Sequence, residues 1–142
     1  PPLAPHAKLH GDFTPSNVLI QKGDAIGIDI WGVRYGPVFE DAARMLTYLG
    51  INSPFALKRA PLVNDDKTSA VFNAFVSGYG PDLMQAEDPA IWHIILYQQL
   101  RRWLVFLDWK KQGRSAIKAQ LELERVRRLT QQTMLYLDRI HL

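Results

Sequence analysis

Residues 10 to 20 read HGDFTPSNVLI, a stretch in which polar side chains come directly before an apolar run. Pro15 and Ser16 favour a turn, so Asn17 is expected to return beside Asp12 as the strand begins. A buried strand has no use for an aspartate and an asparagine at this spacing. The stretch therefore predicts both a tight loop and the place where the chemistry of the chain resides.

The apolar runs at 17 to 21 and 25 to 30 are separated by Lys-Gly-Asp, which predicts a β-hairpin. Because the strands of a hairpin are antiparallel, Asp29 is expected to lie near Asn17. The carboxylates of Asp12 and Asp29 and the amide oxygen of Asn17 would then converge. Hard oxygen donors of this kind suit Mg²⁺. Taken singly, Asp12 and Asn17 are more typical of turn residues, and Asp29 of a cap at the end of a strand. The three together at this spacing favour the metal site.

The remainder of the chain is mainly helical in pattern. Apolar residues recur at helical spacing, and Gly50 suits the C-cap of the first helix. The fold class is therefore mainly α with a small β-hairpin. One domain, 1–142, divides into a loop and hairpin part at 1–36 and a helical part at 37–142. The predicted helices cover about 39–50, 65–78, 89–112 and 115–142.

Composition sets limits on the class of protein. The chain has 142 residues, of which 47% are hydrophobic and 22% charged, as in ordinary globular proteins. Without cysteine it has neither disulfides nor thiolate metal sites. No apolar run approaches the roughly 20 residues of a membrane span, and the N-terminal residues lack a signal-peptide pattern. We therefore expect a cytoplasmic protein with no membrane partner.

The last 42 residues are basic, with ten Lys and Arg against four Asp and Glu. Such a segment can meet nucleic acid. Here, however, the basic residues alternate with Leu, Ile and Val at helical spacing, which is typical of a solvated helix face. Nucleic acid is therefore not an expected partner.

His10-Gly11-Asp12, Asn17 and Ile28-Asp29 together resemble the catalytic segment of the aminoglycoside phosphotransferase and choline-kinase-like family. Members of this family show His-Gly-Asp, four residues, Asn, then Ile-Asp and a later Asp-x-Ala, which Asp41-Ala42-Ala43 matches. The resemblance covers roughly residues 9 to 46. It implies the C-terminal lobe of a protein-kinase-like α+β fold.

The resemblance also implies roles for single residues. Asp12 would be the catalytic base, and Asn17 and Asp29 would hold Mg²⁺ against the phosphates of ATP, so both bind cofactor and metal. His10 would support the loop structurally. Asp41 would tie the loop down through backbone N–H groups, or would be an exposed acid at a helix N-terminus that makes only dipole contacts.

Three departures from the kinase pattern bear on the substrate. Protein kinases carry Lys two residues after the catalytic Asp, whereas this chain has Thr14, which fits the small-molecule kinases better. Trp31 stands where Asp-Phe-Gly has its glycine, and Gly32 comes one residue late. Pro37 replaces an acid that relatives often show, so any role of that acid is missing.

A kinase also needs an N-terminal lobe with a phosphate-covering loop and a Lys that pairs with the phosphates. Only nine residues precede His10, and there is no initiator Met. The expectation is a C-terminal lobe alone, with the N-terminal lobe absent and little or no activity in isolation. A homodimer formed through the surface that would face the missing lobe is then expected.

The function expected is ATP-dependent phosphoryl transfer to a hydroxyl of a small-molecule acceptor. The alternative is a non-catalytic kinase-like domain used for binding or as a scaffold. A third reading is a metal-dependent phosphoesterase with His10, Asp12 and Asp29 as ligands, although such a site would want more His or carboxylates at ligand spacing.

The sequence gives weaker indications of which acceptor substrate would bind. Three acids in one loop would suit a cationic acceptor, and four aromatic residues would line its pocket by stacking. At helical spacing, however, these aromatics are more typical of a core. The acids are Asp82, Glu87 and Asp88, and the aromatics are Trp92, Tyr97, Trp103 and Trp109.

Overall fold

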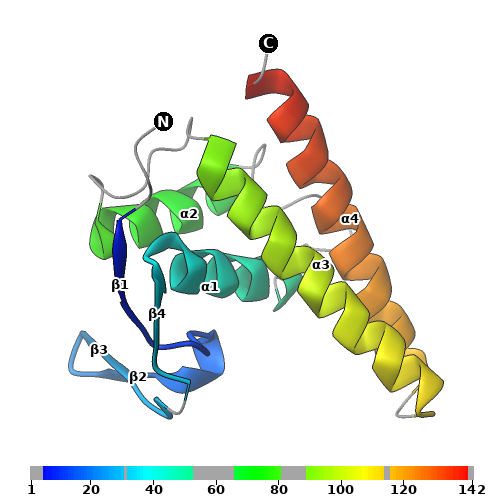
Figure 1. Cartoon of the computed structure of the whole chain (residues 1–142), viewed down its shortest axis with the longest axis horizontal. Coiled ribbons are helices and arrows are strands. Elements are labelled where there is room, and N and C mark those ends of the chain that lie inside the picture. Colours follow the sequence, from blue (N-terminus) through cyan, green and yellow to red (C-terminus); the bar gives the residue numbers. More distant parts are fainter. Residues whose placement is uncertain (1–4, 31, 53–65, 81–88, 114–115, 141–142) are drawn as a thin grey trace.

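The computed structural model describes residues 5–30, 32–52, 66–80, 89–113 and 116–140. Four helices dominate, which confirms the mainly α class with a small β-hairpin (Figure 1). In chain order the elements are β1 (His6–Leu9), the 3-10 turn η1 (Pro15–Asn17), β2 (Val18–Gln21), β3 (Asp24–Gly27), β4 (Arg34–Pro37), α1 (Phe39–Asn52), α2 (Asp66–Tyr79), α3 (Pro89–Lys111) and α4 (Ala116–Ile140).

The predicted hairpin is present but shorter. β2 and β3 pair antiparallel from Val18↔Gly27 to Gln21↔Asp24. Lys22 and Gly23, which join them, have φ values of 52° and 92°, as a two-residue turn requires if it is to match the strand twist. The second strand therefore ends at Gly27, not at residue 30 as the apolar pattern predicted.

A second two-stranded sheet was not predicted. β1 and β4 pair antiparallel from His6↔Pro37 to Leu9↔Arg34. This sheet joins the two ends of the segment that holds the loop and the hairpin, and α1 begins directly after it (Figure 1). The loop and hairpin therefore project from one base beside the first turn of α1.

The first helix continues past its predicted end. α1 passes through Gly50 and ends at Asn52, so the interpretation of Gly50 as a C-cap is wrong. A Cβ on Gly50 would lie 3.2 Å from Cδ2 of Leu129 in α4. Gly50 therefore permits close packing of α1 against α4.

The core lies where α1, α3 and α4 meet, with α3 and α4 running side by side (Figure 1). Among the aromatics considered for an acceptor pocket, Trp92 is fully buried, and Trp103 and Trp109 pack partly buried against the core. Only Tyr97 of the four is exposed. Within the described ranges, no helix is long and apolar enough to cross a bilayer.

Candidate active site

The loop that begins with His-Gly-Asp makes a close backbone approach. Gly11 has φ of 81°, which side-chain-bearing residues rarely adopt. A Cβ at this position would lie 2.2 Å from the backbone oxygen of Gly32. Both constraints require glycine at position 11, and they place the loop against the chain that returns from the hairpin.

Asp41 holds this loop from the first turn of α1. Its Oδ2 accepts the N–H of His10 at 2.5 Å, and its Oδ1 accepts the N–H of Gly11 at 3.1 Å. The side chain is buried, and the helix N-terminus favours its negative charge. Of the two geometries expected for Asp41, the structure has the one in which it ties down the loop.

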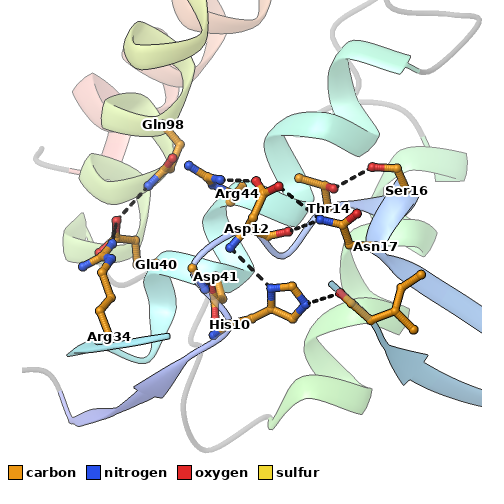
Figure 2. A network of polar contacts seen from close by, with 12 residues as sticks. His10, Asp12, Thr14, Ser16, Asn17, Arg34, Glu40, Asp41, Arg44 and Gln98 are labelled. Atoms are coloured by element: carbon orange, nitrogen blue, oxygen red, sulfur yellow. Dashed lines mark hydrogen bonds and ion pairs between the residues drawn. The ribbon is translucent and has the colours of Figure 1, made fainter. Parts of the chain in front are cut away.

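His10 joins the loop to the hairpin through both ring nitrogens (Figure 2). Nδ1 lies 3.4 Å from the backbone nitrogen of Asp12, and Nε2 lies 2.8 Å from the backbone oxygen of Ile28. A backbone N–H can only donate, so Nδ1 accepts and Nε2 carries the proton that it donates to Ile28. His10 therefore has the contacts of a structural residue and offers no free nitrogen to a metal.

Asn17 returns beside Asp12, as the turn residues predicted. Nδ2 of Asn17 donates to the backbone oxygen of Asp12 at 2.9 Å and to its Oδ2 at 3.1 Å. The backbone N–H of Asn17 also donates to the Thr14 oxygen, which closes the turn. Because Nδ2 makes these bonds, Oδ1 is the atom of Asn17 that can take a metal.

Asp29 lies two residues beyond β3 and not at the strand end. Its backbone is left-handed, with φ of 59°, a conformation that Asp tolerates better than most residues. Ile28 before it donates its N–H to the Asn17 oxygen at 2.9 Å and accepts from His10. These bonds bring the backbone of Asp29 to the start of β2. Asp29 is exposed.

The site offers few donors to a metal ion. Within the ranges that the structure describes, no group of three or more His, Cys, Asp or Glu could hold a metal ion. Asn17 and Asp29 supply two oxygen donors, too few for a cage made by protein alone. Mg²⁺ commonly binds through one or two carboxylates plus waters and substrate phosphates, so these donors fit nucleotide-bound Mg²⁺.

Arg44, which the sequence patterns did not single out, forms an ion pair with Oδ1 of Asp12 (Figure 2). Arg44 lies in α1, 32 residues from Asp12, and its side chain is mostly buried. The available signal was its position three residues after Asp41, on the same side of the helix. Asp12 is thus held by Asn17 and Arg44 while about half of its side chain faces solvent.

A second polar group lies beside this site (Figure 2). Glu40 pairs with Arg34 of β4, and Nε2 of Gln98 in α3 donates to Glu40 at 3.2 Å. The hydroxyls of Thr14 and Ser16 are 2.9 Å apart. The contacts of Glu40 connect α3 and the β1–β4 sheet to the start of α1.

Tyr79, the last residue of α2, supports the same helix start. Its hydroxyl donates to the backbone oxygen of Val38 at 2.7 Å. Burial raises the pKa of Tyr79 to about 12, and the negative charge of Asp41 contributes in the same direction. Tyr79 therefore stays neutral and acts as a donor.

The acids proposed for a cationic acceptor, Asp82, Glu87 and Asp88, lie outside the described residues. A scan of protein-family models and searches of curated proteins and of solved structures found no match to this chain.

Proposed function

We propose that this chain carries the catalytic and metal-binding residues of an ATP-dependent phosphotransferase that acts on a hydroxyl of a small molecule. The observation that carries the proposal is the Asp12–Asn17 contact, made on a loop whose backbone Asp41 fixes. The resemblance of these residues to the small-molecule kinases supports the same assignment, and with it the kinase-like C-terminal lobe.

The chemistry asks for a base and for charge stabilisation. Phosphoryl transfer depends mainly on positioning and electrostatics. The acceptor oxygen forms a bond to the γ-phosphorus, the bond from that phosphorus to the β–γ bridging oxygen breaks, and ADP leaves with the electron pair. The hydroxyl proton passes to the Asp12 carboxylate. Arg44 and Asn17 keep that carboxylate in one orientation throughout.

Mg²⁺, when bound, would supply positive charge to the phosphates of ATP. Oδ1 of Asn17 and the carboxylate of Asp29 are the residues of this chain that would hold it. Ile28 contributes by position alone, since its two backbone hydrogen bonds fix where Asp29 leaves the hairpin.

One observation favours the second candidate, a non-catalytic kinase-like binding domain. Oδ1 of Asp12 already forms an ion pair with Arg44, so part of the carboxylate that a base would use is engaged within the protein. In this reading Asp12 is a structural partner of Arg44, and its replacement lowers stability without changing any turnover.

The test is Asp12→Asn in the natural full-length protein, because this change keeps size and shape. ADP release is measured with Mg·ATP and a panel of small hydroxyl compounds. Removal of a well-placed base lowers turnover by about two to four powers of ten. Asp24→Asn, an exposed hairpin residue, is the matched control and should leave turnover unchanged.

Two results would contradict the phosphotransferase. Turnover equal to wild type in Asp12→Asn would remove the base from the mechanism. No ADP release from the wild-type protein with any acceptor, together with lower stability of Asp12→Asn, would support the binding domain instead.

A further inference from the structure

A small cavity opens between α1 and α3 next to Asp12. It has a volume of about 80 Å³, and its lining includes Arg44, Thr47 and Tyr48 from α1 and Gln98, Arg101 and Arg102 from α3. Arg44 belongs both to this cavity and to the ion pair with Asp12. The cavity is therefore adjacent to the candidate base.

The lining carries a net positive charge. Its three arginines face no lining carboxylate among the residues that the structure describes. Asp12 balances Arg44, whereas Arg101 and Arg102 form no ion pair with a described residue. No described carboxylate lines this cavity, although Glu122 lines the neighbouring cavity that Arg102 also lines. Guanidinium is the side chain that matches phosphate oxygens most closely.

Arg102 is fixed in position before any ligand arrives. Its guanidinium carbon lies 4.7 Å from the ring centre of Tyr48 and 4.3 Å from that of Phe106. Stacking on two aromatic rings restricts the orientations that the guanidinium group can adopt. A cation held in this way loses little conformational freedom when it binds an anion.

Two buried polar atoms of lining residues make no hydrogen bond to any residue that the structure describes. They are Nε of Arg102 and Oγ1 of Thr47. Buried polar groups are nearly always hydrogen-bonded, and an anion in the cavity beside Arg102 and Thr47 is one group that would supply partners. An oxygen-rich anion can accept from the N–H and from the hydroxyl.

Size restricts what enters. A single water needs about 10 to 15 Å³ measured in this way, so about 80 Å³ holds a group of a few atoms and not a whole sugar. A second cavity of about 240 Å³ also has Tyr48 and Arg102 in its lining, and it reaches Pro15 and Ser16 of the loop. It provides room for the body of a larger ligand.

We propose that the cavity between α1 and α3 binds the phosphate group of the acceptor, so that the acceptor is a phosphorylated alcohol whose free hydroxyl lies at Asp12. This assignment rests on the proposed phosphotransferase. The arginines of this cavity match a phosphate dianion better than a carboxylate, and a cationic acceptor would be repelled. The bound phosphate is not transferred; it orients the hydroxyl that attacks ATP.

The test measures binding of inorganic phosphate to the natural full-length protein by calorimetry, without Mg²⁺ or nucleotide. Arg101→Gln removes one cation at an exposed lining residue and should weaken phosphate binding about tenfold to a hundredfold, as expected for a lost charge-assisted hydrogen bond. Arg101→Lys should restore part of the affinity. Arg139→Gln, an exposed change in the last turn of α4, is the control and should bind like wild type.

Two further arms identify the source of the anion. Acetate should bind more weakly than phosphate, and equal affinity would overturn the phosphate assignment in favour of a carboxylate. Saturating Mg·ATP should leave phosphate binding intact; competition between the two would overturn the acceptor assignment, because the cavity would then hold phosphates of the nucleotide.

Failure of this inference is distinct from failure of the proposed function. If Asp12→Asn loses turnover and wild type does not bind phosphate, or binds it no better than Arg101→Gln, the anion site is overturned and the proposed phosphotransferase is not. Phosphate binding that depends on Arg101 combined with full turnover in Asp12→Asn would support the anion site and overturn the assignment of Asp12.

Discussion

Asp41 and Arg44 lie one turn apart on α1, and each holds a different part of the same loop. Asp41 accepts two backbone N–H groups at the start of the loop, and Arg44 pairs with the side chain of Asp12 just after them. A single helical turn therefore fixes both the backbone path and the direction of the candidate base. The geometry of the site depends on how firmly α1 is anchored in the core.

The first prediction concerns Asp41. Asp41→Asn replaces one of two carboxylate oxygens with an amide that cannot accept from the backbone N–H. We expect the free energy of unfolding to fall by about 1.5 to 3 kcal/mol, the range for hydrogen bonds to charged groups. Urea denaturation measures the change, with Asp24→Asn as an exposed control. Equal stability of the two variants would mean that Asp41 does not anchor the loop.

The second prediction concerns Gly11. Gly11→Ala places a Cβ 2.2 Å from a backbone oxygen and imposes a left-handed φ on alanine, so the backbone must move. The free energy of unfolding should fall by more than about 1 kcal/mol. Gly78→Ala in α2 meets no atom within 4 Å and should be neutral or stabilising by up to about 1 kcal/mol. Chemical denaturation should therefore show a loss of stability for Gly11→Ala and none for Gly78→Ala.

The third prediction concerns metal binding. Asn17→Ala and Asp29→Ala each remove one of the two proposed oxygen donors, so each should weaken the affinity for Mg·ATP in the full-length protein. Affinity for ATP without Mg²⁺ should change much less. Calorimetry at several Mg²⁺ concentrations separates the two effects. Variants that bind Mg·ATP as tightly as wild type would exclude both residues as ligands.

The fourth prediction is a pH dependence that arises from Tyr79. The pKa of Tyr79 is about 12 in the folded protein and about 10 in an unfolded chain. Its contribution to stability is therefore complete below pH 10 and is lost as the pH rises through 12, because the unfolded state gives up the proton first. Tyr79→Phe lacks this proton and also the bond to Val38.

Denaturation of wild type and Tyr79→Phe at several pH values checks this dependence. Near neutral pH the variant should be less stable by about 0.5 to 1.5 kcal/mol, the usual net value of one hydrogen bond. The difference should shrink between pH 10 and 12. A difference that stays constant over that interval would show that Tyr79 titrates normally.

The fifth prediction concerns association through the hairpin. Leu19, Ile20 and Ile26 are 52%, 73% and 45% exposed, and exposed apolar groups on an unpaired strand edge favour association. We expect the 142-residue chain to form a dimer in light scattering. Ile20→Lys should shift it toward monomer, whereas Ile117→Lys, at an exposed site on α4, should not. A monomeric wild-type chain would contradict the prediction.

Local patterns predicted much of the fold and the contact at the centre of the site. Turn residues foretold that Asn17 returns to Asp12, because that contact spans five residues and depends on backbone conformation nearby. Helical periodicity located the four helices to within a few residues. These features are encoded by residues close together in the chain.

The missed features are contacts between distant parts of the chain. The β1–β4 sheet pairs strands about 30 residues apart, and β4 includes a Gly and a Pro, which are uncommon within strands. In the sequence Arg44 has the pattern of an ordinary polar residue of a helix, because its contact with Asp12 exists only in the folded chain. The local pattern predicts Gly50 as a C-cap, because its actual role depends on Leu129, which lies far away in the chain.

The hairpin has a mechanical consequence. None of the eight residues of β2 and β3 is buried, whereas α1 shares the main core with α3 and α4. Segments with few buried contacts open at lower free energy than the whole molecule unfolds. The site is therefore built from two parts of unequal rigidity: Asp12 is tied to the helical core, and Asp29 to the segment that yields first. Mild heating or low denaturant should therefore move the carboxylate of Asp29 away from that of Asp12 well before the helices unfold.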